Sequence, residues 1–106
     1  MEIEFTWDQE KARRNLVKHR LVKHRVSFDV ASQVFADPFM IVVEDCEVEG
    51  EIRYHAPGHI NTGLTLVLVV FVDRSDVDRE VIRIISAREA DQYEQRTYAD
   101  QFESGN

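Results

Sequence analysis

The sequence is poor in cysteine and has no long apolar run. Its single cysteine, Cys46, cannot form an internal disulfide, and no group of cysteine and histidine has the spacing of a zinc site. The longest apolar run, Leu64–Val72, is too short to cross a bilayer. The first ten residues are acidic and lack the apolar segment of a signal peptide. These absences predict a cytoplasmic protein without membrane contact, and the length of 106 residues predicts one domain over residues 1–106.

The chain also lacks an excess of positive charge. It has 13 Lys and Arg against 20 Asp and Glu, and the net charge of −7 argues against a general nucleic-acid binder. The charge is unevenly distributed: residues 1–25 carry seven cationic and four acidic side chains, a net +3, which leaves −10 for residues 26–106. A basic N-terminal segment on an acidic body allows local contact with an anion or with an acidic partner.

The N-terminal quarter predicts a short strand and a helix. Ile3–Trp7 alternates weakly between apolar and polar residues, as an edge strand does. Thr6 and Gln9 fit a capping box, which predicts a helix over residues 8–24. Residues 16–25 hold the pentapeptide LVKHR twice in tandem. The second copy either lengthens the helix by about 7.5 Å or forms part of a longer loop.

The rest of the chain predicts a second helix and a sheet. Ser27 fits the N-cap of a helix that ends at Asp37-Pro38. The predicted strands that follow are Phe39–Val43, Glu51–Ala56, Leu64–Val72 and Val81–Ser86, separated by predicted turns at Asp45–Gly50, Pro57-Gly58 and Asp73–Asp78. Successive strands with short turns favour an antiparallel β-sheet meander. With two N-terminal helices and one C-terminal helix, this gives an α+β fold.

The segment Val81–Arg88 is typical of a buried strand that continues into a helix, because its apolar residues occupy both faces. Ser86 and Glu89 fit the S-x-x-E capping box, which predicts a last helix from Arg88 and a frayed tail at residues 102–106. The guanidinium groups of Arg83 and Arg88 flank this predicted junction. Guanidinium groups pair well with phosphate oxygens, so the junction is a candidate anion site.

Several short motifs, taken together and in order, resemble the BrnT-type toxins of type II toxin–antitoxin systems. They are WDxxKxxxN (Trp7, Asp8, Lys11, Asn15), KHxVSF (Lys23, His24, Val26, Ser27, Phe28), VFADP (Val34–Pro38), GExR (Gly50, Glu51, Arg53), RIISARxA (Arg83–Ala90) and ExxxY (Glu94, Tyr98). The resemblance spans roughly Phe5–Tyr98. It implies a RelE-like α+β fold and a metal-independent ribonuclease without a cofactor.

The same resemblance implies a protein partner. It implies that a small ribbon-helix-helix antitoxin of the BrnA type neutralises the toxin. It also implies that the toxin contacts DNA only through this antitoxin and that the two proteins can form a higher-order complex. This chain departs from the family pattern at Arg25, where the family usually has glycine, at the duplicated pentapeptide, and at the acidic start of the last helix. The last two departures motivate a rival hypothesis: a catalytically degenerate module that keeps only the binding of its antitoxin.

RNA can be cleaved by its own 2′-hydroxyl when a base, a cation for the charged phosphate and an acid for the leaving oxygen are in place. The predicted catalytic residues are Arg53 and Arg83 as cations, with His24 and Lys23 as acid or base candidates. The predicted substrate-binding residues are Arg88, Lys11 and His55.

Each of these residues also has a structural explanation. Arg83 can instead pair with Glu51, Glu94 or another carboxylate and stabilise the sheet, since buried arginines are usually paired. Arg53 and Lys11 can lie on solvated faces, and His24 can cap the first helix. His55 and His59 are too few ligands for a metal site, so none is predicted.

Overall fold

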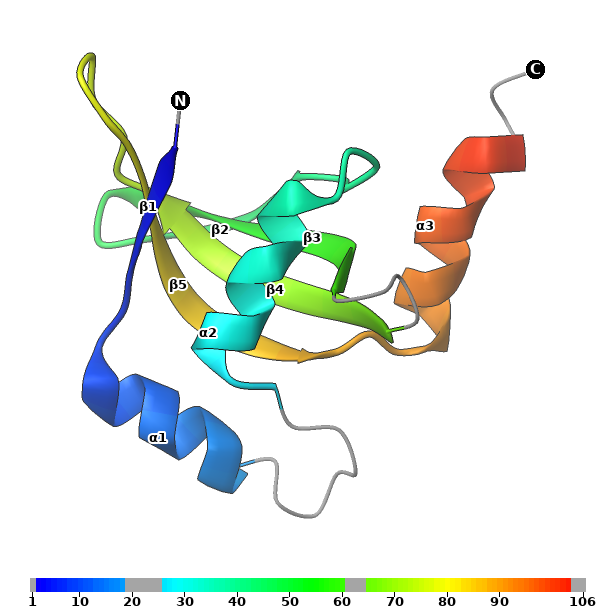
Figure 1. The fold of residues 1–106 in the computed structure, drawn as a ribbon, viewed down its shortest axis with the longest axis horizontal. Helices are drawn as coiled ribbons and strands as arrows, with labels where there is room; N and C mark the ends of the chain where they lie inside the picture. Colours follow the sequence, from blue (N-terminus) through cyan, green and yellow to red (C-terminus); the bar gives the residue numbers. More distant parts are fainter. Residues whose placement is uncertain (1, 19–25, 61–64, 104–106) are drawn as a thin grey trace.

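A mixed five-stranded sheet organises the chain, as seen in a computed structural model that describes residues 2–18, 26–60 and 65–103 (Figure 1). The elements in chain order are β1 (Ile3–Thr6), α1 (Gln9–Lys18), α2 (Phe28–Ala31), the 3-10 helix η1 (Ser32–Ala36), β2 (Val43–Val48), β3 (Glu51–Ile60), β4 (Thr65–Asp73), β5 (Glu80–Glu89) and α3 (Gln92–Glu103). The strand order is β1-β5-β4-β3-β2. No helix in the described part of the chain is long and apolar enough to span a membrane.

The predicted α+β class and the meander of β2 to β5 are confirmed, and β4 is the central strand. The predicted edge strand at Ile3–Trp7 is confirmed as β1, which lies outside the antiparallel meander and pairs with β5 in parallel, with Thr6 opposite Arg83. β1 joins the sheet from the far end of the chain. Turn signals between neighbouring segments cannot indicate such a pairing.

The hydrophobic core lies on one face of the sheet, beneath α2 and η1. Figure 1 shows these helices crossing in front of the sheet. The fully buried residues of this core include Ala31, Val34, Ala56, Val67, Val69, Ile84 and Ala87. Gly58 permits the close packing of η1 on β3, since a Cβ atom there would lie 2.6 Å from Val34 Cγ1. The opposite side of the sheet is called the open face below; α3 packs on one end of it, through Leu66, Ala90 and Tyr98.

Strand β3 continues through Pro57-Gly58, so the predicted break there is wrong. The carbonyl of Pro57 accepts a hydrogen bond from the Ile41 N–H at 3.4 Å, on the side away from β4. In an extended strand the N and C=O of one residue point to the same side, so the N–H that proline lacks falls outside the β3–β4 ladder. The position therefore tolerates proline.

The β2–β3 hairpin is longer than predicted. β2 occupies Val43–Val48, a segment that was mostly assigned to a turn, and Phe39–Val42 is not a strand. The turn is reduced to Glu49 and Gly50, whose φ angles are 50° and 83°. Positive φ at both central residues is typical of a type I′ turn, which matches the twist of the two strands.

Strand β5 also runs further than predicted, to Glu89. The prediction that Ser86 and Glu89 form the capping box of the last helix is therefore wrong. The capping box of α3 lies five residues later. The Glu94 N–H donates to Asp91 Oδ1 at 2.8 Å, and the Asp91 N–H donates to Glu94 Oε1 at 2.9 Å. The register of β4 and β5 shifts between Val70 and Phe71, so Ile85 is an extra residue in a β-bulge.

The caps of the first two helices have different outcomes. The Thr6–Gln9 box is wrong, because Asp8 Oδ1 accepts the Lys11 N–H at 3.1 Å and so caps α1. Ser27 is confirmed as the cap of α2, since its Oγ accepts the Val30 N–H at 3.2 Å. The predicted extension of the first helix to His24 and the second pentapeptide copy lie outside the described residues.

Asn15 of α1 is a buried polar residue, with 6% of its surface exposed. Its Nδ2 donates to the carbonyls of Ala87 at 2.8 Å and Val26 at 3.2 Å, and its Oδ1 accepts the Ala87 N–H at 3.4 Å. β1 pairs with β5 only as far as Arg83. Asn15 thus supplies, from a helix, the hydrogen bonds that a neighbouring strand would give to β5 at Ala87.

We expect Asn15→Ala to lower the free energy of unfolding by about 2–3 kcal/mol, because it leaves buried backbone groups of Ala87 and Val26 without partners. Urea denaturation followed by circular dichroism measures the change. Arg14→Ala, an exposed substitution on the same helix, is the control and should remain within about 0.5 kcal/mol of the wild type. An Asn15→Ala protein as stable as this control would contradict the assigned role.

Candidate functional site

Arg53 and Arg83 lie in one row across the open face. Arg53 is opposite Val72 in the β3–β4 pair, and Val72 is opposite Arg83 in the β4–β5 pair. Directly opposite residues point to the same side of a sheet, and two strand spacings amount to about 10 Å. The sheet therefore places two long guanidinium side chains on either side of Val72. Both are partly buried.

Neither Arg53 nor Arg83 forms a hydrogen bond or an ion pair with a side chain in the described ranges. The two carboxylates proposed as partners for Arg83 are held elsewhere. Glu51 receives two hydrogen bonds from Arg74, at 3.0 and 2.9 Å, and Glu94 receives two from Arg88, both at 2.8 Å. The alternative that Arg83 is paired with one of these glutamates is therefore wrong.

The charges of the two arginines still act on nearby carboxyl groups. The pKa of Glu51 is lowered, first by the hydrogen bonds from Arg74 and further by the positive charges of Arg53 and Arg83. The pKa of Asp8 is lowered first by the hydrogen bond from the Lys11 N–H, with additional contributions from the charges of Arg83 and Lys11. The field of Arg83 thus reaches both the β2–β3 hairpin and the start of α1.

His55 and Ser86 form the next row of the open face, on either side of Val70. His55 follows Arg53 by two residues on β3, so both side chains are on the same face about 7 Å apart along the strand. Its Nδ1 lies 4.0 Å from Asp45 Oδ2, and the side chain is 33% exposed. The structure thus brings the predicted residue His55 next to the arginine row.

Lys11 reaches the same region from α1. It is exposed and lines a cavity of about 220 Å³ together with Arg14, Asn15, Ile85 and Ser86. Four of the predicted site residues, Arg53, Arg83, His55 and Lys11, therefore border one part of the open face. Sequence reasoning missed Arg14 and Ser86, because only the β-bulge and the docking of α1 place them there.

Arg88 lies apart from this group. It is opposite Leu68, four residues along β4 from Val72, which corresponds to about 13 Å. Its guanidinium is held by Glu94, and this hydrogen bonding raises the pKa of Arg88. The structure does not bring Arg88 to the pair formed by Arg53 and Arg83. The predicted residues Lys23 and His24 lie outside the described residues.

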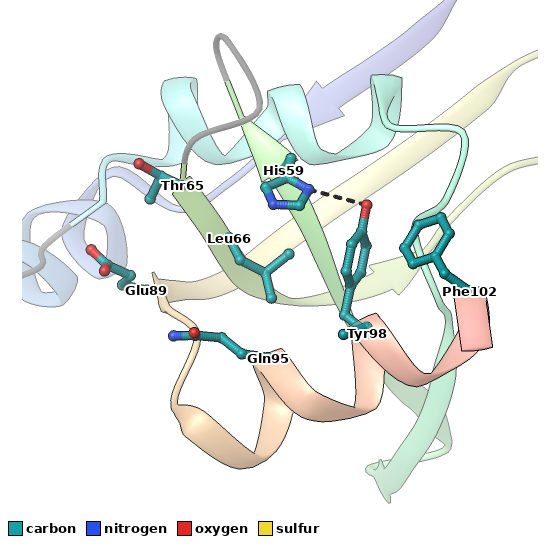
Figure 2. A pocket seen from close by; sticks show the side chains of 8 residues that line it. His59, Thr65, Leu66, Glu89, Gln95, Tyr98 and Phe102 are labelled. Atoms are coloured by element: carbon teal, nitrogen blue, oxygen red, sulfur yellow. Dashed lines mark hydrogen bonds between the residues drawn. The ribbon is translucent and has the colours of Figure 1, made fainter. Parts of the chain in front are cut away.

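A second polar cluster joins β3, α3 and Asp37 at the end of η1, and Figure 2 shows two of its members, His59 and Tyr98. Tyr98 Oη donates to Asp37 Oδ2 at 2.7 Å and lies 3.1 Å from His59 Nδ1. Asp37 also accepts the backbone N–H of His59 and of Phe39, both at 2.8 Å. A cavity of about 490 Å³ lies beside His59 and Tyr98. No apolar periodicity indicated this cluster, although Asp37 and Tyr98 both belong to motifs of the family resemblance.

The carboxylate form of Asp37 and the neutral form of Tyr98 are favoured together. Burial alone would raise the pKa of Asp37, but the hydrogen bonds from the His59 and Phe39 N–H groups and from Tyr98 outweigh it, so the pKa is lowered. Burial and the hydrogen bond to Asp37 raise the pKa of Tyr98 to about 12. The cluster therefore fastens α3 to β3 across the neutral pH range. In the described residues, no three His, Cys, Asp or Glu side chains gather as metal ligands do.

We expect Tyr98→Phe to destabilise the fold by about 1–2 kcal/mol at neutral pH, because Asp37 loses one buried donor. Since the pKa of Tyr98 is raised, its contribution is complete below pH 10 and is lost as pH rises toward about 12. The difference from the wild type should therefore shrink over that interval, as measured by urea denaturation. Tyr93→Phe, on the 78% exposed tyrosine of the same helix, is the control. Equal stability of both variants would refute the role of Tyr98.

Comparison with known proteins identifies the family. The model of the ribonuclease toxin BrnT of type II toxin–antitoxin systems matches residues 7–94, which include α1, the whole meander and the start of α3. A search of curated proteins gives no match. The match confirms the resemblance seen in the motifs, and it covers Arg53, Arg83 and His55 of the open face, whereas Tyr98 lies outside it. The chain belongs to the BrnT family of ribonuclease toxins of type II toxin–antitoxin systems.

Proposed function

We propose that this protein cleaves RNA at a phosphate held between Arg53 and Arg83 on the open face. The observation that carries the proposal is the placement of two arginines in one row without a carboxylate partner among the described residues. Unpaired, partly desolvated guanidinium groups favour an anionic ligand, and their planar fork pairs with two phosphate oxygens. Membership of a ribonuclease family supports RNA as the source of that phosphate.

The proposed reaction is metal-independent and needs no cofactor. The 2′-oxygen of the substrate attacks the adjacent phosphorus, the bond from phosphorus to the 5′-oxygen breaks, and the products end in a 2′,3′-cyclic phosphate and a 5′-hydroxyl. Arg53 and Arg83 stabilise the extra negative charge on the pentacovalent phosphate. His55 binds the substrate beside Arg53, and Lys23 and His24 stay as candidates for the base that takes the 2′-hydroxyl proton and the acid that protonates the leaving oxygen.

The rival hypothesis is a degenerate module that binds only its antitoxin. The acidic start of the last helix and the duplicated pentapeptide motivate it, and the second copy of the pentapeptide lies outside the described residues. The structural role of Asp91 weakens the motive drawn from the helix, because Asp91 forms the capping box of α3 with Glu94, a residue of the family motif ExxxY. Acidic residues are favourable at a helix N-terminus for electrostatic reasons alone. This end of the sheet is also remote from the arginine row.

A type II toxin has a protein antitoxin as its partner. We propose that the antitoxin here is of the ribbon-helix-helix BrnA type, that the pair assembles in the cytoplasm into a complex that can be of higher order, and that contact with DNA occurs only through the antitoxin. The RelE-like assignment of the fold is part of the same proposal.

The proposal predicts that Arg53→Ala/Arg83→Ala reduces RNA cleavage in excess chelator by at least about a hundredfold. The reason is that the negative charge of the pentacovalent phosphate loses both guanidinium groups that stabilise it. Cleavage of a labelled single-stranded RNA and analysis of its 2′,3′-cyclic ends measure this. Arg13→Ala/Arg79→Ala removes the same charge from two exposed, glutamate-paired arginines and is the control, with activity near that of the wild type.

Two outcomes would contradict the proposal. Equal cleavage by the wild type and by the Arg53→Ala/Arg83→Ala protein would place the reaction elsewhere or reveal a contaminant. Absence of cleavage by a folded wild-type protein, together with absence of growth arrest when the chain is expressed alone, would favour the degenerate module.

A further inference from the structure

A cavity of about 220 Å³ lies where α1 meets the bulge of β5, and its lining is cationic. Lys11 and Arg14 come from α1, and Ile85 and Ser86 come from β5. Lys11 and Arg14 are three residues apart and so lie on the same side of the helix. Both are exposed, and neither forms an ion pair with a described carboxylate. Two cations that form no ion pair with a described carboxylate therefore line the cavity.

The neighbouring Arg13 shows that this arrangement is specific to one side of α1. Its Nη2 lies 2.7 Å from Glu10 Oε2, so its charge is compensated. It lines a different cavity, which includes Trp7 and Phe28 and lies between α1 and α2. The two consecutive arginines therefore have different surroundings: Arg13 is paired with Glu10, and Arg14 lines the cavity beside β5.

The rest of the lining is rigid and complements an anion. Asn15 forms one wall, and its amide is fully engaged with Val26 and Ala87, so it fixes α1 against β5 and is not available to a ligand. Ser86 contributes a hydroxyl that can donate a hydrogen bond. Asp8 near the start of the helix accepts the Lys11 N–H, and its carboxylate is a negative group whose pKa is lowered by this hydrogen bond and further by the charge of Lys11. Donors therefore predominate around the cavity.

The cavity adjoins the arginine row. Ser86 is opposite Val70 on β4, and Arg83 is opposite Val72. Because Val70 and Val72 are two residues apart on one strand, Ser86 and Arg83 belong to neighbouring rows of the same face. An RNA strand whose scissile phosphate lies over Val72 can run past Ser86 toward α1. There it would meet Lys11 and Arg14 with its next phosphates.

We propose that Lys11, Arg14 and Ser86 form a second phosphate-binding site, which holds a neighbouring phosphodiester of the single-stranded RNA substrate. This inference rests on the proposed function for its biological setting, but its binding chemistry can be tested separately. The site contributes to substrate binding and sets a minimum substrate length; it takes no part in bond cleavage. Arg14 is the member that the family motifs did not indicate.

The test compares Arg14→Ala with Arg13→Ala, which remove the same charge from adjacent exposed positions of α1. With a single-stranded RNA of several nucleotides, Arg14→Ala should raise KM about tenfold and leave kcat nearly unchanged, because one charge-assisted contact is lost. With a dinucleoside monophosphate, which has only the scissile phosphate, Arg14→Ala should behave as the wild type. Arg13→Ala should behave as the wild type with both substrates.

A binding experiment separates this inference from the proposed reaction. The probe is a 2′-O-methyl RNA, which lacks the attacking hydroxyl, and fluorescence anisotropy gives its affinity at several salt concentrations. Loss of one phosphate contact should reduce the slope of log K against log salt by about 0.7 for Arg14→Ala. This result would support the second site even if the wild type cleaved no RNA.

Three outcomes would overturn the inference. Equal weakening by Arg13→Ala and Arg14→Ala would indicate a general effect of charge. An equal rise in KM for the dinucleoside monophosphate would place Arg14 at the scissile phosphate. Unchanged binding of the 2′-O-methyl RNA, with loss of binding to a polyglutamate peptide, would assign the cations to an acidic protein partner.

Discussion

The sheet depends on two side chains that complete its hydrogen bonding where its outer strands end. β1 pairs with β5 only as far as Arg83, and β2 pairs with β3 only as far as His55. Beyond these points the inner strands would present unpaired backbone groups, which are costly when buried. Asn15 hydrogen-bonds to Ala87 on β5, and Asp37 accepts the His59 N–H on β3. Each side chain acts as a short substitute for a missing strand.

These two substitutes also position the helices. Because Asn15 is fixed to Ala87, α1 lies against the edge of β5, and the cations that neighbour Asn15 are directed to the bulge at Ile85. Because Asp37 also binds Tyr98, the same carboxylate that closes β3 fastens α3 to the far end of the open face. The part of the face that remains uncovered is the part that holds the arginine row. The hydrogen bonds of Asn15 and Asp37 therefore both complete the sheet edges and determine which part of the open face stays free for the candidate site.

Much of the fold could be predicted because its signals are local. The Ser27 cap, the apolar run of β4 and the short turns of the meander each depend on residues close in sequence. The start of α3 could not be chosen in this way, because both S-x-x-E at Ser86 and D-x-x-E at Asp91 are valid capping boxes. What decides between them is the continued pairing of β5 with β4, a tertiary contact that no local pattern encodes.

The site was predictable in its residue types but not in its geometry. Arg53 and Arg83 were chosen for their chemistry, yet their common row follows from the register of two strand pairs. A slip of one residue in either pair would place them on opposite faces. Arg88 was chosen by the same chemistry and lies elsewhere, because the bulge and the longer β5 carry it to Glu94. Residue type alone does not separate a free arginine from a paired one.

Four glutamates of the described chain are paired with arginines outside the arginine row, so they do not compete for Arg53 or Arg83. Glu4, Glu10, Glu51 and Glu94 are each bound by an arginine other than Arg53 or Arg83. Exposed pairs of this kind add little stability, typically about 0–1 kcal/mol. Their consequence at the open face is electrostatic, since Glu51, two residues from Arg53, is compensated by Arg74.

The overall charge of −7 acts on RNA only over a limited range, because charges separated by more than about 8 Å are largely screened at physiological salt. A strand of RNA on the open face therefore responds mainly to the groups within that distance of its phosphates. Around Val72 and Ser86 these include Arg53 and Arg83, and Lys11 and Arg14 at the adjoining cavity. Net charge argued against nucleic-acid binding because it takes no account of where the charges lie; the position of individual charged side chains determines whether a face attracts a phosphate.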